Sequence, residues 1–153
     1  MTNARVVAYF YCSRFETVAS QPTHIGTVGQ GFSIVPIDIL INLTPPFMPS
    51  AFSFGFGIGI SGLDLRKENL IRYEFASPSN NTLLEQIIPL RIEESHLAGF
   101  DDDMPGCYAQ IALHNIALEE EGYYTSKVYV NDHLVGEFPI KSKAVRFHAD
   151  SAV

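Results

Sequence analysis

The sequence lacks tryptophan, contains only two cysteines and has few charged residues, which make up 18% of the chain. Cys12 and Cys107 are too few for a disulfide framework and have no CxxC spacing, so we expect buried free thiols and no zinc or redox site. No apolar run approaches the roughly 20 residues that cross a bilayer. The first residues carry no small-residue cleavage pattern of the kind that ends a secretion signal. These absences predict a cytoplasmic protein with no membrane partner.

Basic residues are also scarce, with ten lysines and arginines against 17 acidic residues and a net charge of −7. Because phosphate backbones repel such a surface, nucleic acid is not an expected partner. Hydrophobic residues reach 46% of 153 positions, which is typical of one packed domain. We assign residues 1–141 to a single domain and residues 142–153 to a C-terminal tail.

Motifs of catalysis are missing as well. None of the five histidines stands in an HxH or HExxH spacing, and no serine lies in a GxSxG turn. Cys12 falls inside a predicted strand, which is a poor position for a nucleophile. We therefore assign no catalytic residue and expect no cofactor. An enzyme whose site is assembled only by the fold stays open as a third possibility.

What the sequence does contain is alternation. In AFSFGFGIGISG, residues 51–62, phenylalanine and isoleucine alternate with glycine and serine, which is the period of a β-strand. The spacing fits neither the dinucleotide nor the P-loop pattern, so this is not a phosphate-binding loop. Gly55, Gly57 and Gly59 leave one face of the strand bare, and glycine in a strand marks a close approach by other atoms. Those atoms belong either to a loop or large side chain of the same chain, or to a partner chain or ligand.

Other segments show strand patterns too, at residues 6–12, 37–43, 71–75, 84–92, 109–118, 124–130 and 134–140. The apolar phase changes at residues 114–115, which predicts a β-bulge there. Residues 82–85 match a helix capping box, but Pro89 would stop a helix, so we prefer a strand. In the last hairpin, a three-residue loop at Asn131–His133 would align the apolar positions of its two strands.

These patterns predict an all-β fold with about eight or nine strands. An antiparallel β-sandwich with Greek-key connections is the most economical arrangement, and a closed β-barrel is the alternative. The proline-rich segment TPPFMPS, residues 44–50, is interpreted as a stiff crossover between strands. The candidate interaction surface combines the apolar residues of this crossover with the bare strand face: Phe47, Met48, Gly55, Gly57 and Gly59.

The order of several segments resembles a family of small bacterial β-sandwich proteins. The segments are VVAYFYC, HIGTVGQGFSIV, the proline crossover, IRYEFASPSN and LEEEGYYTSKVYVNDHLVGEFPI, and they span most of residues 5–141. The closing pattern, acidic residues followed by Gly-Tyr-Tyr and a valine-rich hairpin, is also similar to that of many immunoglobulin-like domains. The resemblance implies a β-sandwich fold and a bacterial or phage origin, and it implies no activity.

An acidic segment, EESHLAGFDDDMPG at residues 93–106, offers a possible ion site. Loops at one end of a β-sandwich gather carboxylates around calcium in C2-type domains. The candidate metal ligands are therefore Glu94, His96, Asp101, Asp102 and Asp103. The spacing is not that of an EF-hand, and three adjacent acids cannot all face one ion, so a solvated acidic loop is the preferred interpretation.

The leading functional hypothesis is a non-enzymatic binding or protein-interaction module that self-associates, with another protein as the alternative partner. The bare strand face and the apolar crossover motivate it. The second hypothesis is a calcium- or other ion-dependent binding module that uses the acidic loop at residues 93–103. The third is the enzyme whose site only the fold would assemble.

Overall fold

The structure, a computed structural model, describes residues 3–19, 32–64, 66–91 and 106–145, most of which lie in β-strands. The strands are β1 (Arg5–Ala19), β2 (Phe32–Leu40), β3 (Asn42–Leu43), β4 (Ser50–Ser61), β5 (Asn69–Ala76), β6 (Thr82–Leu90), β7 (Gly106–Leu118), β8 (Gly122–Val130) and β9 (His133–Ser142). Nine strands agree with the eight or nine predicted. Among the described residues, no helix is long and apolar enough to cross a membrane.

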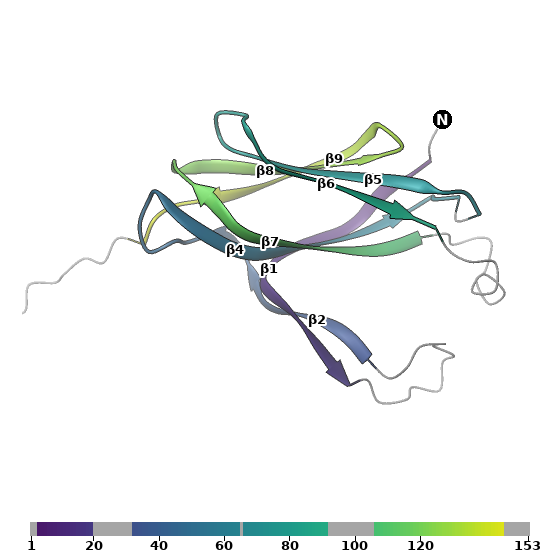
Figure 1. Ribbon diagram of the computed structural model, residues 1–153, viewed down its shortest axis with the longest axis horizontal. Helices are drawn as coiled ribbons and strands as arrows, with labels where there is room; N and C mark the ends of the chain where they lie inside the picture. Colours follow the sequence, from purple (N-terminus) through teal and green to yellow (C-terminus); the bar gives the residue numbers. More distant parts are fainter. Residues whose placement is uncertain (1–2, 20–31, 65, 92–105, 146–153) are drawn as a thin grey trace, which may run out of the picture.

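The strands form two sheets packed face to face (Figure 1). The first sheet has the order β2-β1-β4-β7, and the second has the order β3-β9-β8-β5-β6. Neighbouring strands pair antiparallel, except that β3 runs parallel to β9. In the part of the chain that the structure describes, both sheets end in edge strands and neither closes on itself. The fold is therefore the predicted β-sandwich, and the barrel alternative is wrong.

The strand order is that of an immunoglobulin-like sandwich. In that fold, strand B lies between A and E in one sheet, and strand F lies between C and G in the other. Here β4 lies between β1 and β7, and β8 lies between β5 and β9. Near the start of β8, the hydroxyl of Tyr124 donates a hydrogen bond to the carbonyl of Glu120 at 2.8 Å. This contact matches the tyrosine corner that precedes strand F in such domains. β2 is an added strand beyond β1, and it projects away from the sandwich (Figure 1).

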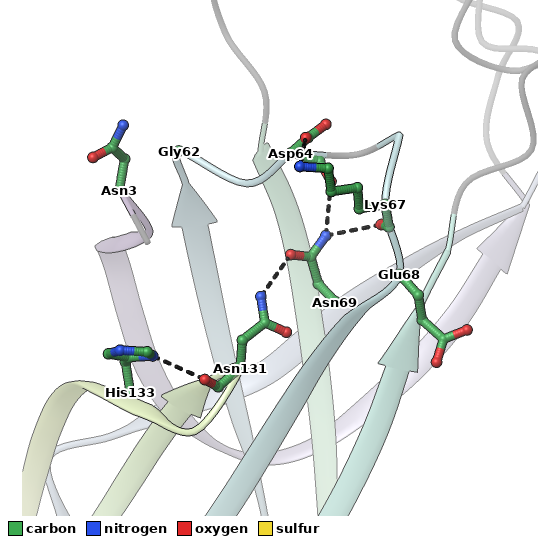
Figure 2. Close-up of a pocket in the computed structure, with 8 residues that line it drawn as sticks. All are labelled: Asn3, Gly62, Asp64, Lys67, Glu68, Asn69, Asn131 and His133. Carbon is green, nitrogen blue, oxygen red and sulfur yellow. Dashed lines mark hydrogen bonds and ion pairs between the residues drawn. The ribbon is translucent and has the colours of Figure 1, made fainter. Parts of the chain in front are cut away.

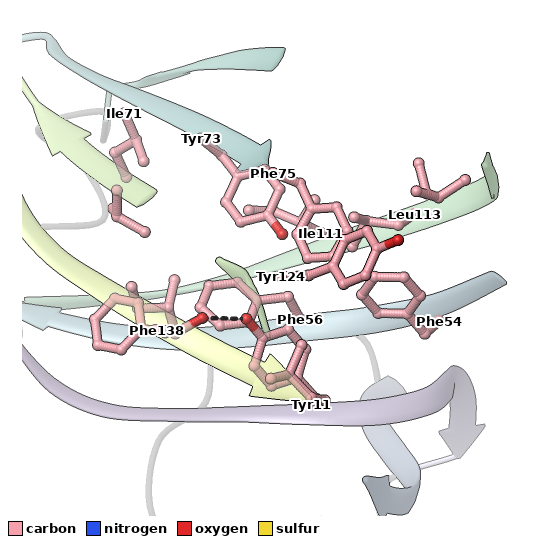
Figure 3. Close-up of a cluster of buried hydrophobic side chains, with 14 of the residues drawn as sticks. Tyr11, Phe54, Phe56, Ile71, Tyr73, Phe75, Ile111, Leu113, Tyr124 and Phe138 are labelled. Carbon is pink, nitrogen blue, oxygen red and sulfur yellow. Dashed lines mark hydrogen bonds between the residues drawn. The ribbon is translucent and has the colours of Figure 1, made fainter. Parts of the chain in front are cut away.

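The core lies between the two sheets, where β4 buries Phe54, Phe56, Ile58 and Ile60. Figure 3 shows the two phenylalanine rings within this core. The ring centroid of Phe56 lies 4.9 Å from that of Tyr11 in the first sheet and 5.4 Å from that of Tyr73 in the second. The largest fully buried side chains are Tyr73, Tyr124, Phe56, Phe75, Leu43, Ile58, Ile60, Leu63, Ile71, Ile111, Leu113 and Leu118. Because successive side chains of a strand point to opposite faces, the glycines of β4 point away from this core.

A buried polar network links the sheets at the centre of the core. The Tyr11 hydroxyl is hydrogen-bonded to Ser126 Oγ at 2.7 Å and to the Phe138 carbonyl at 2.6 Å. Ser126 Oγ lies 2.8 Å from the Tyr73 hydroxyl. Ser126 stands two residues after Tyr124, where antibody domains have the second cysteine of their inter-sheet disulfide. Hydrogen bonds therefore connect the sheets where a covalent bridge connects them in antibody domains.

The structure corrects the last hairpin. Val130 pairs with His133, so the loop consists of two residues, Asn131 and Asp132, and the predicted three-residue loop is wrong. Both loop residues have positive φ angles, 49° and 65°, as a type I′ turn requires. The register shifts further along, where Val128 pairs with Gly136. This bulge in β9, rather than a longer loop, aligns the apolar positions of the two strands.

Two other local predictions are confirmed. The register of β4 and β7 shifts after the Phe54–Leu113 pair, and Asn115 has a φ angle of 52°, so the bulge lies where the apolar phase changes. Residues 82–90 form strand β6 and not a helix. The proline-rich crossover joins β3 in the second sheet to β4 in the first.

Candidate interaction surface

The bare side of β4 belongs to a larger uncharged surface on the outside of the first sheet. Across from the three glycines, β1 and β7 present their own outward residues in register. We call the combined set the glycine face: Ala8, Phe10, Cys12, Gly55, Gly57, Gly59, Tyr108, Gln110 and Ala112. None of its members carries a formal charge.

Side chains of neighbouring strands cover two of the glycines. A Cβ added to Gly57 would collide with the ring of Phe10 and would lie 2.7 Å from the Tyr108 hydroxyl. A Cβ added to Gly55 would lie 2.6 Å from Cε2 of Phe15. Of the alternatives that the sequence left open, the first, a large side chain of the same chain, therefore holds at these two positions. Aromatic rings that pack over strand glycines in this way replace the missing side-chain contacts.

The aromatic side chains of the face also contact one another. The ring of Phe10 stacks on that of Tyr108 with centroids 6.1 Å apart, and it meets the ring of Phe15 at 6.3 Å. Phe10 and Tyr108 come from β1 and β7, which lie on opposite sides of β4. The glycines thus allow two rings from non-adjacent strands to touch across the middle strand.

This surface remains accessible despite the rings. Tyr108 is 51% exposed, and two apolar neighbours of the face are exposed further, Val7 at 61% and Ile39 at 59%. Val7 lies beside Gly59, where its Cγ2 would be 3.4 Å from an added Cβ, and Ile39 pairs with Cys12. The glycine face therefore has exposed aromatic and aliphatic side chains beside positions that carry no formal charge.

The outer face of the second sheet is different. Arg72 forms an ion pair with Glu74, and its guanidinium lies 3.8 Å from the centre of the Tyr129 ring. Lys127 lies 4.0 Å from a carboxylate oxygen of Glu137. Charged side chains of both signs therefore lie at the centre of this face, beside exposed apolar side chains such as Leu70 and Tyr123.

The five residues of the predicted interaction surface lie on two elements, the crossover and strand β4. The three glycines share the glycine face, but Phe47 lies in the crossover, where it is 64% exposed. Met48 packs against the core and is partly buried. The predicted metal ligands Glu94, His96, Asp101, Asp102 and Asp103 lie outside the described residues. Within the described ranges, no group of three or more histidine, cysteine or carboxylate side chains could hold a metal ion.

Both cysteines are free thiols, as predicted. Cys12 is a buried member of the glycine face, and Cys107 is half-buried. Burial raises the pKa of each thiol, so each favours the neutral, unreactive form at neutral pH.

A polar hollow of about 430 Å³ lies at one end of the sandwich (Figure 2). Its lining comprises Asn3, Gly62, Asp64, Lys67, Glu68, Asn69, Asn131 and His133. The buried amide of Asn69 donates to the carbonyls of Asp64 and Lys67, and its oxygen accepts from Asn131. Asn131 in turn accepts from the backbone N–H of Leu70. Since these amides already bind the protein itself, the hollow is explained as a structural corner between two turns.

Sequence reasoning missed Phe10 and Tyr108 as members of the glycine face, and Val7 and Ile39 as its exposed neighbours. Residues 8, 10 and 12 have the phase of an outward-facing strand, but β1 is apolar on both sides and its phase is ambiguous. The pairing of Phe10 with Gly57 spans 47 positions, and no local pattern specifies such a register. A search for aromatic residues able to cover the strand glycines is the signal that could have found them.

No family model and no curated protein matches the chain. Among solved structures, an immunoglobulin-like protein from Pseudomonas aeruginosa aligns over 92% of this chain and 97% of its own, at 12% identity and a TM-score of 0.40. The alkylpurine DNA glycosylase AlkC from Pseudomonas fluorescens aligns over 68% of this chain at 8% identity and a TM-score of 0.41. A β-glucosidase from Listeria innocua aligns over 88% at 11% identity and a TM-score of 0.43. This chain spans 28% of the glycosylase and 17% of the glucosidase. The immunoglobulin-like class is assigned from the strand order and the tyrosine corner, and not from these comparisons.

Proposed function

We propose that the chain is a non-enzymatic protein-interaction module that self-associates through the glycine face. The observation that supports this function best is the contrast between the two outer faces of the sandwich. The glycine face presents aromatic and small residues without formal charge, and the ion pair of Arg14 with Glu16 lies farther along β1. The outer face of the second sheet presents paired charges among its central strands. The centres of protein interfaces are depleted of charged residues and enriched in aromatic ones.

The shape and charge of the glycine face favour a second copy as the partner. A chain with a net charge of −7 repels its own kind over most of its surface, and this repulsion is weakest where two uncharged faces meet. Aromatic rings already lie over Gly55 and Gly57, so a second copy would contact these rings and the exposed ring of Tyr108 rather than the backbone beneath them. A two-fold symmetric contact uses the same patch on both copies. A patch without charges can face itself in this way, because no charge meets a like charge.

Charge placed on the face tests this function. Ala112 is an exposed member of the face on β7, so Ala112→Glu adds a carboxylate with little effect on the core. Leu70→Glu is the control, because Leu70 is 44% exposed on β5 of the second sheet. Light scattering at matched concentrations should show an associated parent chain, a dissociated Ala112→Glu variant and an unchanged Leu70→Glu variant. Urea titrations should show that both variants are folded. An Ala112→Glu chain with the parental mass would contradict the proposal.

A further inference from the structure

Among the described strands, two are edge strands in each sheet, and an edge presents unpaired backbone N–H and C=O groups to other chains. The edges are β2 and β7 in the first sheet, and β3 and β6 in the second. Proteins usually protect such edges with proline, charge, bulges or short length. The four edges differ in how far they are protected.

Three of the edges are protected by their own residues. β2 contains Pro36 and the charged Asp38, whose φ angle of 51° interrupts the extended backbone. β6 contains Pro89 and Glu85. β3 has only two residues. Because proline cannot donate a ladder hydrogen bond and like charges repel across a symmetric pair, these strands are poor templates for pairing with a copy of themselves.

The fourth edge, β7, lacks this protection over its first eight residues, Gly106–Leu113. They contain neither proline nor a charged residue, and they pair with β4 in unbroken register. The bulge at Asn115 follows this segment and distorts the strand beyond it. Of the strands that the structure describes, none pairs with β7 on its other side. We call residues 106–113 the open edge.

We propose that the open edge pairs antiparallel with the open edge of a second copy about a two-fold axis, joining two four-stranded sheets into one of eight strands. This geometry rests on the proposed self-association and places its contact at the β7 border of the glycine face, so that the glycine faces of the two copies lie side by side in one sheet. The open edge favours the same segment as its partner because a strand without charges meets no like charge when it pairs with itself. Two copies, each with a net charge of −7, repel each other, so their contact is most favourable where it contains no charged residue.

Pairing at the open edge would extend the glycine face across the dimer. Tyr108, Gln110 and Ala112 of β7 point to the outer side of the sheet, next to the glycines of β4. In a two-fold pair, the same side chains of the second copy continue the surface on the other side of the axis. Backbone hydrogen bonds would then supply the contact, and the exposed ring of Tyr108 would pack near the new seam.

Opposite charges at Gln110 test the pairing. Gln110 lies near the middle of the open edge, so a two-fold pair brings the two Gln110 side chains close together on the same face. Gln110→Lys and Gln110→Glu chains should each dissociate, with self-association weakened by about tenfold or more. An equimolar mixture of the two variants should form the dimer again, because opposite charges then face each other across the axis. Ala117→Lys and Ala117→Glu provide the control, since Ala117 is exposed on β7 beyond the bulge.

Sedimentation velocity of each variant and of the mixtures decides between the outcomes. Restoration by mixing at Gln110, and unchanged association of the Ala117 variants, is the expected result. A parent dimer that persists in both Gln110 variants would overturn the pairing and leave the interaction module in place. Dissociation without restoration on mixing would show that a different surface lies opposite the open edge, and would also overturn the pairing. A parent chain that stays monomeric would refute the self-association on which the pairing rests.

Discussion

Replacing Ser126 with alanine tests whether the buried hydroxyl network holds the two sheets together. The Tyr73 hydroxyl is fully buried and lies 2.8 Å from Ser126 Oγ. Without that oxygen, the Tyr73 hydroxyl loses this partner in the core. Tyr11 is affected less, because its hydroxyl keeps the hydrogen bond to the Phe138 carbonyl.

The expected magnitude follows from the cost of a buried polar group without a partner. Ser126→Ala should lower the free energy of unfolding by about 1–3 kcal/mol, since it leaves the Tyr73 hydroxyl desolvated and unpaired. Tyr73→Phe removes one hydrogen bond and should cost about 1 kcal/mol. The double variant has no stranded Tyr73 hydroxyl. Its loss should therefore be smaller than the sum of the two single losses by at least about 1 kcal/mol.

Urea titrations of the parent, the two single variants and the double variant give all four free energies. The slope of the transition should stay the same in all four chains, because the surface exposed on unfolding does not change. Tyr129→Phe is the matched control for Tyr73→Phe, since its ring lies on the outer face of the second sheet beneath Arg72. If the loss of the double variant equals the sum of the two single losses to within about 0.5 kcal/mol, Ser126 and Tyr73 act independently and the reasoning is refuted.

Three further predictions concern the same fold. Burial raises the pKa of Tyr11 and Tyr73 above the ordinary value of 10.0, so above pH 10 the tyrosines of the unfolded chain ionise first. The free energy of unfolding should therefore be level near neutral pH and fall as the pH rises above 10. Urea midpoints measured against pH should show this fall, and Tyr73→Phe should make it smaller. Tyr124→Phe should lower the free energy of unfolding by about 0.5–1.5 kcal/mol through loss of the hydrogen bond to Glu120, and an unchanged urea midpoint would show that the tyrosine corner contributes nothing. Gly57→Val should lower the free energy of unfolding by about 1–3 kcal/mol, because it displaces the Phe10 ring that covers Gly57. Gly59→Val should lower it less, because the nearest atom would lie 3.4 Å from the added Cβ. Equal shifts of the two variants in thermal melts would contradict the overlap of a Gly57 side chain with Phe10.

Local patterns in the sequence were sufficient to predict most of the strands. β4 was predicted from its period of two, since phenylalanine and isoleucine fill one phase and glycine and serine the other. The bulge near Asn115 was predicted because a change of apolar phase has to be absorbed within the strand. Strand β6 was predicted because Pro89 cannot continue a helix.

The turn of the last hairpin was mispredicted for a physical reason. Aligning the apolar residues of β8 and β9 requires one extra residue, which can be placed either in the loop or in a bulge. Asn131 and Asp132 both tolerate positive φ, so the tight two-residue turn is available and the extra residue moves into β9 near Gly136. The turn residues decide this choice, and the hydrophobic pattern alone does not.

The candidate surface was predictable only in part. The sequence identifies the glycines, because they stand out within an alternating strand. It does not identify Phe10 and Tyr108 as the rings that cover Gly57, since their contact depends on the register of β1 and β7 against β4. The open edge depends on topology in the same way, because a strand becomes an edge only through its place in the sheet.

Sedimentation of the unmodified chain over a wide range of concentration is the most direct test of the proposed function. If the chain is a module that associates with itself through an uncharged face, its mass should rise with concentration from that of one chain to that of two. The association should persist at high salt, because the contact that we propose contains no ion pairs to be screened. A mass that stays at one chain over the whole range would contradict the proposed function.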